Sequence, residues 1–234
     1  MNPREALAAL IANPAAFLKH YPVKIAGAGG NLNTTNVRTY FFDKQGAWSG
    51  IFPGETLGHK GATRPGLFKD HQISSFRFNH SRVSADTALT RALVVPMVNY
   101  NSTLYGCHDM QGDVTAMPHF RLDGSGDGLM LTGELSGCCF SWIDYGANLI
   151  CTHVQPHAGI DGIKLQTKLT TQGRFAAVPT APLNTFGRTD YPSRASIIGV
   201  CKGAQWYLYA QTSSDSLKTI TGAYQIHPGP KRRL

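Results

Sequence analysis

The chain has few charged residues, no long apolar run and little of the composition of a helical protein. Charged residues make up only 15% of its 234 positions. Its longest uninterrupted apolar stretches fall far short of the ~20 residues that a membrane helix needs. A hydrophobic content of 42% is ordinary for a globular chain of this length. With 25 glycines and 13 prolines, the composition favours short strands and many loops.

Paired cysteines are also missing, because the chain has five cysteines and an odd number excludes a fully paired disulfide framework. Reduced thiols in a cytosol are the better expectation. No C-x-x-C or H-E-x-x-H spacing occurs. A zinc site from Cys138, Cys139, Cys151 and His153 stays open as an alternative, although consecutive strand residues point to opposite faces.

The N-terminus resembles a signal peptide in its apolar character, but its first residues predict a helix start. Asn2 is suited to the cap, Pro3 to the first turn, and Glu5 stands three residues after the cap. Asn13 followed by Pro14 repeats this device. We therefore expect residues 1–20 to form a helical appendage packed on a single domain spanning residues 1–234, without a signal peptide.

The remainder predicts an α+β fold, a sandwich of mixed β-sheets flanked by helices and long loops. Alternation of apolar and polar residues, helical spacing and turn residues predict the following segments: strands at 35–42, 73–78 and 93–100, helices at 81–93 and 158–169, a hairpin at 195–212 and a long loop at 178–194.

The most informative segment of the chain runs from Cys138 to His153. Residues 141–143 and 149–151 are strand-like, and residues 144–147 form a plausible four-residue turn. Closing that turn sets Cys138 opposite His153, with Cβ atoms about 5 Å apart. A free thiol has a pKa near ~8.5, so a nearby imidazole is what a cysteine nucleophile requires.

The competing interpretation is structural. A buried cysteine behaves as a small hydrophobe, and a lone histidine usually has no catalytic role. The prediction also depends on the turn, because one residue of slip sends the two side chains to opposite faces.

Two other patterns suggest ligands. Residues 123–134 match the spacing of a calcium-binding EF-hand loop, but strand-like flanks favour a Gly/Asp-rich hairpin loop. The net charge of +8 suggests a nucleic-acid or acidic protein partner. The basic residues are scattered except for residues 231–233, which we expect to be a solvated tail, so no direct nucleic-acid binding is expected.

The run Leu135-Ser136-Gly137-Cys138, with a histidine on the next strand, resembles the bacterial glutamine-deamidase toxins. That family includes the catalytic domain of cytotoxic necrotizing factor and Burkholderia lethal factor, and chemotaxis receptor deamidases are a more distant structural cousin. In the lethal-factor branch a threonine precedes the nucleophile by six residues, and Thr132 stands there. The resemblance covers about residues 129–156, and its matched positions are Thr132, Leu135, Ser136, Gly137, Cys138 and His153.

The resemblance implies a mechanism for converting glutamine to glutamate. Cys138 would attack the side-chain amide, and backbone N–H groups around Ser136, Gly137 and Cys138 would hold the oxyanion. His153 would protonate departing ammonia and then activate water against the thioester. Thr132 would orient the imidazole.

The resemblance also implies a biological setting. The chain would be a bacterial toxin or effector, a virulence factor made in the bacterial cytoplasm and acting in the cytosol of a target cell. Its partner would be a host protein carrying the substrate glutamine, a translation factor or a small GTPase. No cofactor, metal or membrane is expected, and the protein would be a monomer. The alternatives are a non-catalytic basic binding protein with a structural Cys/His pair, or a zinc-binding protein.

Overall fold

The computed structural model describes residues 1–25, 37–48, 73–82, 84–101, 108–124, 126–145, 148–157, 159–179, 182–213 and 220–234. Its helices are α1 (Pro3–Ala12), α2 (Pro14–His20) and α3 (Gly162–Gln172), with a short 3-10 turn at Gly126–Gly128. Its strands are β1 (Val23–Ile25), β2 (Val37–Trp48), β3 (Ile73–Asn79), β4 (Thr87–Val95), β5 (Met97–Asn99), β6 (His108–Asp109), β7 (Phe120–Leu122), β8 (Leu129–Thr132), β9 (Cys139–Tyr145), β10 (Asn148–Gln155), β11 (Asn184–Phe186), β12 (Arg194–Lys202), β13 (Gln205–Ser213), β14 (Ile220–His227) and β15 (Arg232–Arg233).

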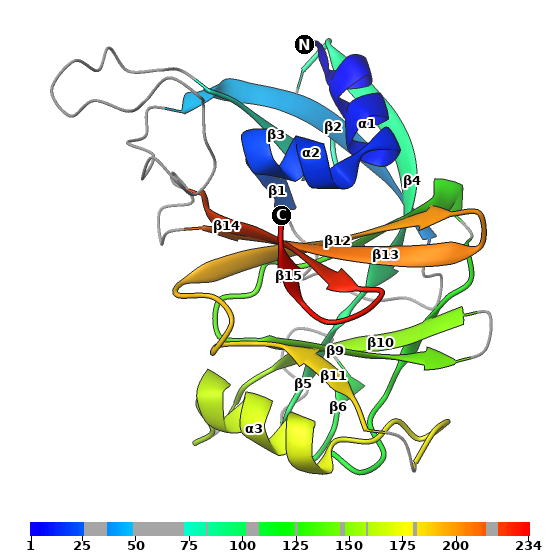
Figure 1. Ribbon diagram of the computed structural model, residues 1–234, viewed down its shortest axis with the longest axis vertical. Helices are drawn as coiled ribbons and strands as arrows, with labels where there is room; N and C mark the ends of the chain where they lie inside the picture. Colours follow the sequence, from blue (N-terminus) through cyan, green and yellow to red (C-terminus); the bar gives the residue numbers. More distant parts are fainter. Residues whose placement is uncertain are drawn as a thin grey trace, which may run out of the picture.

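The protein is a mixed α/β structure, mostly strands, in which two mixed sheets are stacked and helices cover the outer faces (Figure 1). The larger sheet has nine strands in the order β1-β3-β2-β4-β8-β12-β13-β14-β15 and curls into a half-barrel. The smaller has the path β11-β9-β10-β5-β6, and β7 also pairs with β10. The predicted fold class is therefore confirmed.

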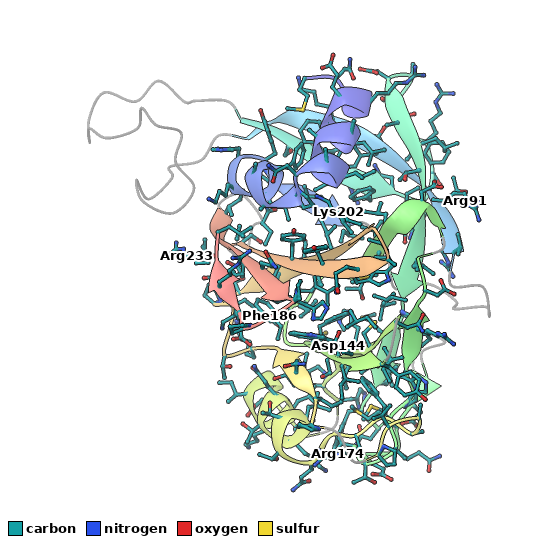
Figure 2. The ribbon with its side chains drawn as sticks, turned by 45° about the vertical axis from the view of Figure 1, so that its right-hand side comes forward. Arg91, Asp144, Arg174, Phe186, Lys202 and Arg233 are labelled. Atoms are coloured by element: carbon teal, nitrogen blue, oxygen red, sulfur yellow. The ribbon has the colours of Figure 1, made fainter. Side chains whose placement is uncertain are left out.

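Three hydrophobic clusters alternate with these layers. The first lies between the N-terminal helices and the curled sheet and includes Leu10, Phe17 and Phe76. The second lies between the two sheets, and the third lies between the smaller sheet and α3. Side chains fill the space between the layers in Figure 2. None of the helices in the described ranges is long and apolar enough to cross a membrane.

The N-terminal helices start where the sequence predicts. The Asn2 side chain accepts a hydrogen bond from the Glu5 N–H at 2.9 Å, and the Glu5 carboxylate accepts one from the Asn2 N–H at 3.0 Å. The Asn13 side chain caps α2 through the Ala16 N–H at 3.1 Å. Such a reciprocal cap satisfies N–H groups that a helix start leaves without partners.

The segment at 81–93, predicted to be helical, is instead largely strand β4. Its apolar residues were matched to a helical spacing, but Leu89 is 64% exposed while Ala88, Thr90 and Ala92 face the core. Alternation of buried and exposed residues is the strand pattern, and here the buried positions carry small side chains. The helical prediction was therefore wrong.

Three loop predictions also need correction. Residues 178–194 contain β11, which pairs with β9. Residues 231–233 are not a free tail, because β15 pairs with β14. Residues 123–134 do not close a hairpin: β7 belongs to the smaller sheet and β8 to the larger one. In this connection Glu134 forms an ion pair with Arg194, and Asp127 accepts from the Arg91 N–H.

Candidate active site

Cys138 lies on a connection between the two sheets. Residues 133–138 leave β8 in the larger sheet and enter β9 in the smaller one. A second connection, residues 187–193, returns from β11 to β12. The first connection is tied to the start of β12, where Leu135 and Ala195 exchange backbone hydrogen bonds of 2.8 and 2.9 Å. The candidate nucleophile therefore sits where both layers meet.

The β9–β10 pairing departs from the predicted register by two residues. His153 lies opposite Phe140, and Val154 lies opposite Cys139. Asn148 pairs with Tyr145, so Asp144 and Tyr145 belong to the strand rather than to a four-residue turn. The direct opposition of Cys138 and His153 was therefore wrong. A shift of two residues leaves every side chain on its original face, because side chains alternate with a period of two.

The predicted common face is confirmed. Cys138 packs in the cluster between the sheets, together with Phe140, Trp142 and Cys151. The neighbouring Cys139 belongs to the cluster under α3, on the other side of the smaller sheet. His153 pairs with Phe140 and shares its side of the sheet. Cys138 and His153 thus face the layer between the two sheets.

Thr132 meets His153 across that layer. The Thr132 hydroxyl, on β8, lies 2.8 Å from His153 Nδ1 and 2.7 Å from the Val95 carbonyl oxygen. A carbonyl can only accept, so the hydroxyl proton is directed to Val95. The bond to His153 then needs the proton on Nδ1, which leaves the Nε2 lone pair as the free acceptor of the ring.

Burial keeps this imidazole neutral. His153 is fully buried, and desolvation lowers its pKa to about 3. Its Nε2 atom is buried and has no hydrogen-bond partner among the residues that the structure describes. An unpaired buried acceptor costs free energy, roughly 1–3 kcal/mol, and is uncommon in a structural histidine. The arrangement therefore presents a neutral imidazole whose basic nitrogen is unused.

The backbone around Cys138 is held by a tyrosine that the sequence did not single out. The Tyr191 hydroxyl accepts from the Gly137 N–H at 2.9 Å and donates to the Cys138 carbonyl oxygen at 2.8 Å. Tyr191 is almost completely buried, and its ring stacks on Phe186 of β11, which Figure 2 labels. Tyr191 lies in the segment predicted to be a long loop, and nothing in the local sequence distinguished it. Ser136, also expected at the oxyanion site, is exposed.

Two glycines, Gly137 and Gly162, are each required for a different reason. The φ of +139° at Gly137 is a conformation that residues with a side chain rarely adopt. Gly162, in the first turn of α3, is required because a Cβ there would stand 2.4 Å from the Gly137 carbonyl oxygen. Both glycines therefore allow the Cys138 segment to pack directly under the start of α3.

Two of the other described thiols, Cys139 and Cys151, are poor candidates for chemistry. Desolvation raises the pKa of Cys139 and of Cys151, and both side chains are completely buried. A buried thiol whose pKa is raised is inert as a nucleophile. Among the residues that the structure describes, no three His, Cys, Asp or Glu side chains are grouped to hold a metal ion. Cys107 lies outside the described residues.

Comparison with known proteins adds no family. No protein-family model matches the chain, and a search of curated proteins finds no significant match to its sequence.

Proposed function

We propose that the protein is a cysteine-dependent amidase that deamidates a glutamine side chain of another protein. The observation that carries the proposal is the Thr132–His153 contact. It fixes the imidazole so that Nε2 is a free base in the layer that also holds the Cys138 thiol. Thiol, base and orienting hydroxyl are the three parts of a nucleophilic triad.

The proposed reaction has two halves. The Cys138 sulfur gives its proton to His153 Nε2 and attacks the carboxamide carbon of the glutamine. The tetrahedral intermediate then expels ammonia, which takes the proton from His153 and leaves a thioester. Water, deprotonated by the same nitrogen, attacks the thioester carbon, releases the thiol and leaves glutamate. Thr132 keeps Nε2 directed toward the reacting groups throughout, as a positioning residue.

The sequence motif supports the choice of substrate class. The run from Leu135 to Cys138, with Thr132 and His153, resembles the glutamine-deamidase toxins of bacteria. That resemblance suggests a bacterial effector acting on a host protein, such as a translation factor or a small GTPase. The net charge of +8 would favour encounter with an acidic partner.

The test is a search for conversion of glutamine to glutamate in host lysate. Lysate is incubated with the wild-type protein or with Cys138→Ser, and tryptic peptides are compared by mass spectrometry. We expect at least one exposed glutamine to gain the mass of an amide-to-acid conversion only with the wild-type protein. Cys139→Ser is the matched control, because this neighbouring thiol faces the other side of the sheet and should be dispensable.

One observation favours a second candidate function. Cys138 is only 5% exposed and His153 is not exposed at all, as expected for a structural pair in a basic binding protein. The two candidates differ in thiol reactivity. An activated Cys138 should react with iodoacetamide below pH 8 and lose that reactivity in His153→Asn, whereas a structural cysteine should be unreactive in both proteins.

A further inference from the structure

Cys138 and His153 are closed off from solvent, so a protein-borne glutamine can reach them only if part of the structure moves. The strands that carry the site are poorly suited to move. β8 is paired on both sides by β4 and β12, and β10 is paired by β5, β7 and β9. The connection at residues 187–193 differs, because several of its contacts are made by single side chains.

From these contacts we propose that residues 187–193 form a gate over Cys138, with the Tyr191 hydroxyl as its latch. This inference rests on the proposed function for its purpose. It rests on the contacts of Tyr191, Asp190 and Arg188 for its geometry.

In the closed structure, the Tyr191 hydroxyl occupies a backbone hydrogen-bond donor that the reaction needs. Tyr191 binds the Gly137 N–H, one of the backbone donors expected to hold the oxyanion. In the closed structure this donor is engaged by the tyrosine. When the gate opens, the same N–H is released to a substrate carbonyl oxygen. Opening therefore uncovers the thiol and completes the site in one movement.

A second set of contacts clasps the gate from outside. Asp190 accepts from Gln166 Nε2 of α3 at 2.7 Å and forms an ion pair with Lys231. Gln166 in turn accepts from the Thr189 N–H at 2.8 Å. The Lys231 side chain is about half exposed, at 44%, so salt or a charged partner can compete for it.

Arg188 keeps the gate segment in one piece. Its guanidinium donates to the backbone carbonyl oxygens of Tyr191 and Pro192 and lies 5.7 Å from the centre of the Tyr191 ring. These contacts are internal to residues 187–193. They would be kept when the segment moves. The hydrogen bonds of the Tyr191 hydroxyl, and the contacts of the segment with Gln166 and Lys231, would have to break.

The experiment measures opening without any substrate. Cys138 of the full-length protein is labelled with iodoacetamide, and its labelling is located by mass spectrometry beside that of Cys139 and Cys151. The variants are Tyr191→Phe for the latch and Lys231→Gln for the clasp. Tyr145→Phe and Lys164→Gln are matched controls at exposed sites.

We expect Cys138 labelling to accelerate about tenfold in Tyr191→Phe, because the closed form loses both hydrogen bonds of the Tyr191 hydroxyl. Lys231→Gln should accelerate it about twofold to threefold, and added salt should do the same to the wild type. Hydrogen exchange at the Gly137 amide should rise in Tyr191→Phe, a readout specific to the latch. The buried Cys139 and Cys151 should stay unlabelled throughout.

Unchanged Cys138 labelling in a folded Tyr191→Phe protein would overturn the gate. So would equal acceleration at Cys138, Cys139 and Cys151, because that outcome reports global unfolding. The outcome is independent of the amidase proposal: Cys138-specific acceleration supports the gate even if no lysate glutamine is converted. Conversion of glutamine with unchanged labelling would retain the amidase and exclude the gate.

Discussion

The β9–β10 and β12–β13 hairpins are built alike but treat their buried polar groups differently. In β12–β13 the buried Gln211 amide is fully used, donating to Leu18 and Tyr21 carbonyl oxygens and accepting from the Val23 N–H. In β10 the buried Thr152 hydroxyl and His153 Nε2 have no hydrogen-bond partner within the described part of the chain. A satisfied buried polar group stabilises a fold, whereas an unsatisfied one costs stability. The comparison separates a structural hairpin from a candidate catalytic one.

The largest expected effect comes from removing only the unused nitrogen. In His153→Asn, the side-chain amide can still donate to Thr132 from near the position of Nδ1, while Nε2 is deleted. We expect glutamine conversion to fall by on the order of a thousandfold, the range of general acid–base catalysis. Thermal unfolding should show stability equal to or above that of the wild type. Retained conversion would show that Nε2 is not the base.

The second prediction concerns acid. The pKa of His153 is about 3 in the folded protein and 6.5 as the ordinary value, so between these pH values the unfolded state binds more protons. Stability is therefore fully present above about pH 6.5 and is lost as the pH falls toward 3. The loss attributable to His153 is roughly 4 kcal/mol. Urea unfolding of the wild type and of His153→Asn is measured across this pH range. The contribution of His153 is the difference between the two proteins in how steeply the unfolding free energy falls with pH.

A matched change in the other hairpin should have the opposite consequence. Gln211→Leu leaves the Leu18 and Tyr21 carbonyl groups and the Val23 N–H without their partner. We expect a loss of about 3 kcal/mol in unfolding free energy, because buried polar groups are left unsatisfied. Conversion per folded molecule should be unchanged. A loss of activity without a loss of stability would contradict the contrast between the two hairpins.

The smallest expected effect is at Thr132. Thr132→Val preserves the side-chain shape but removes the hydroxyl between Val95 and His153. We expect glutamine conversion to fall about tenfold, because the imidazole loses its orientation but not its basic nitrogen. Thr132→Ser, which restores the hydroxyl, should recover most of the rate. Equal activity in both variants would assign the threonine to packing alone.

Parts of the fold were predictable because local and tertiary preferences agree. The segment at 195–212 alternates strongly and forms β12 and β13, joined at Gly203 and Ala204, both with positive φ. That conformation is the hairpin turn that matches strand twist. The turn is confined to these two residues, because Lys202 still pairs with Gln205.

The candidate site was predictable in its face but not in its distances. Side chains alternate along both strands, so Cys138 and His153 stay on the same side of the sheet for any register shift by an even number of residues. Thr132 came from a resemblance, and its contact with His153 spans two different sheets. Tyr191 was missed because it reaches Cys138 from 53 residues away, through a coil segment with no periodicity. Contacts between distant segments depend on how the layers stack, which local patterns do not encode.

The origin of the site in two sheets has a consequence for folding. Thr132 comes from β8 of the curled sheet and His153 from β10 of the smaller one, and Cys138 lies on the chain that joins them. Neither layer holds the full set by itself. In a partly folded state with only one sheet formed, the Cys138 thiol would have no imidazole positioned near it. The proposed activation of the thiol would therefore require that both sheets have docked.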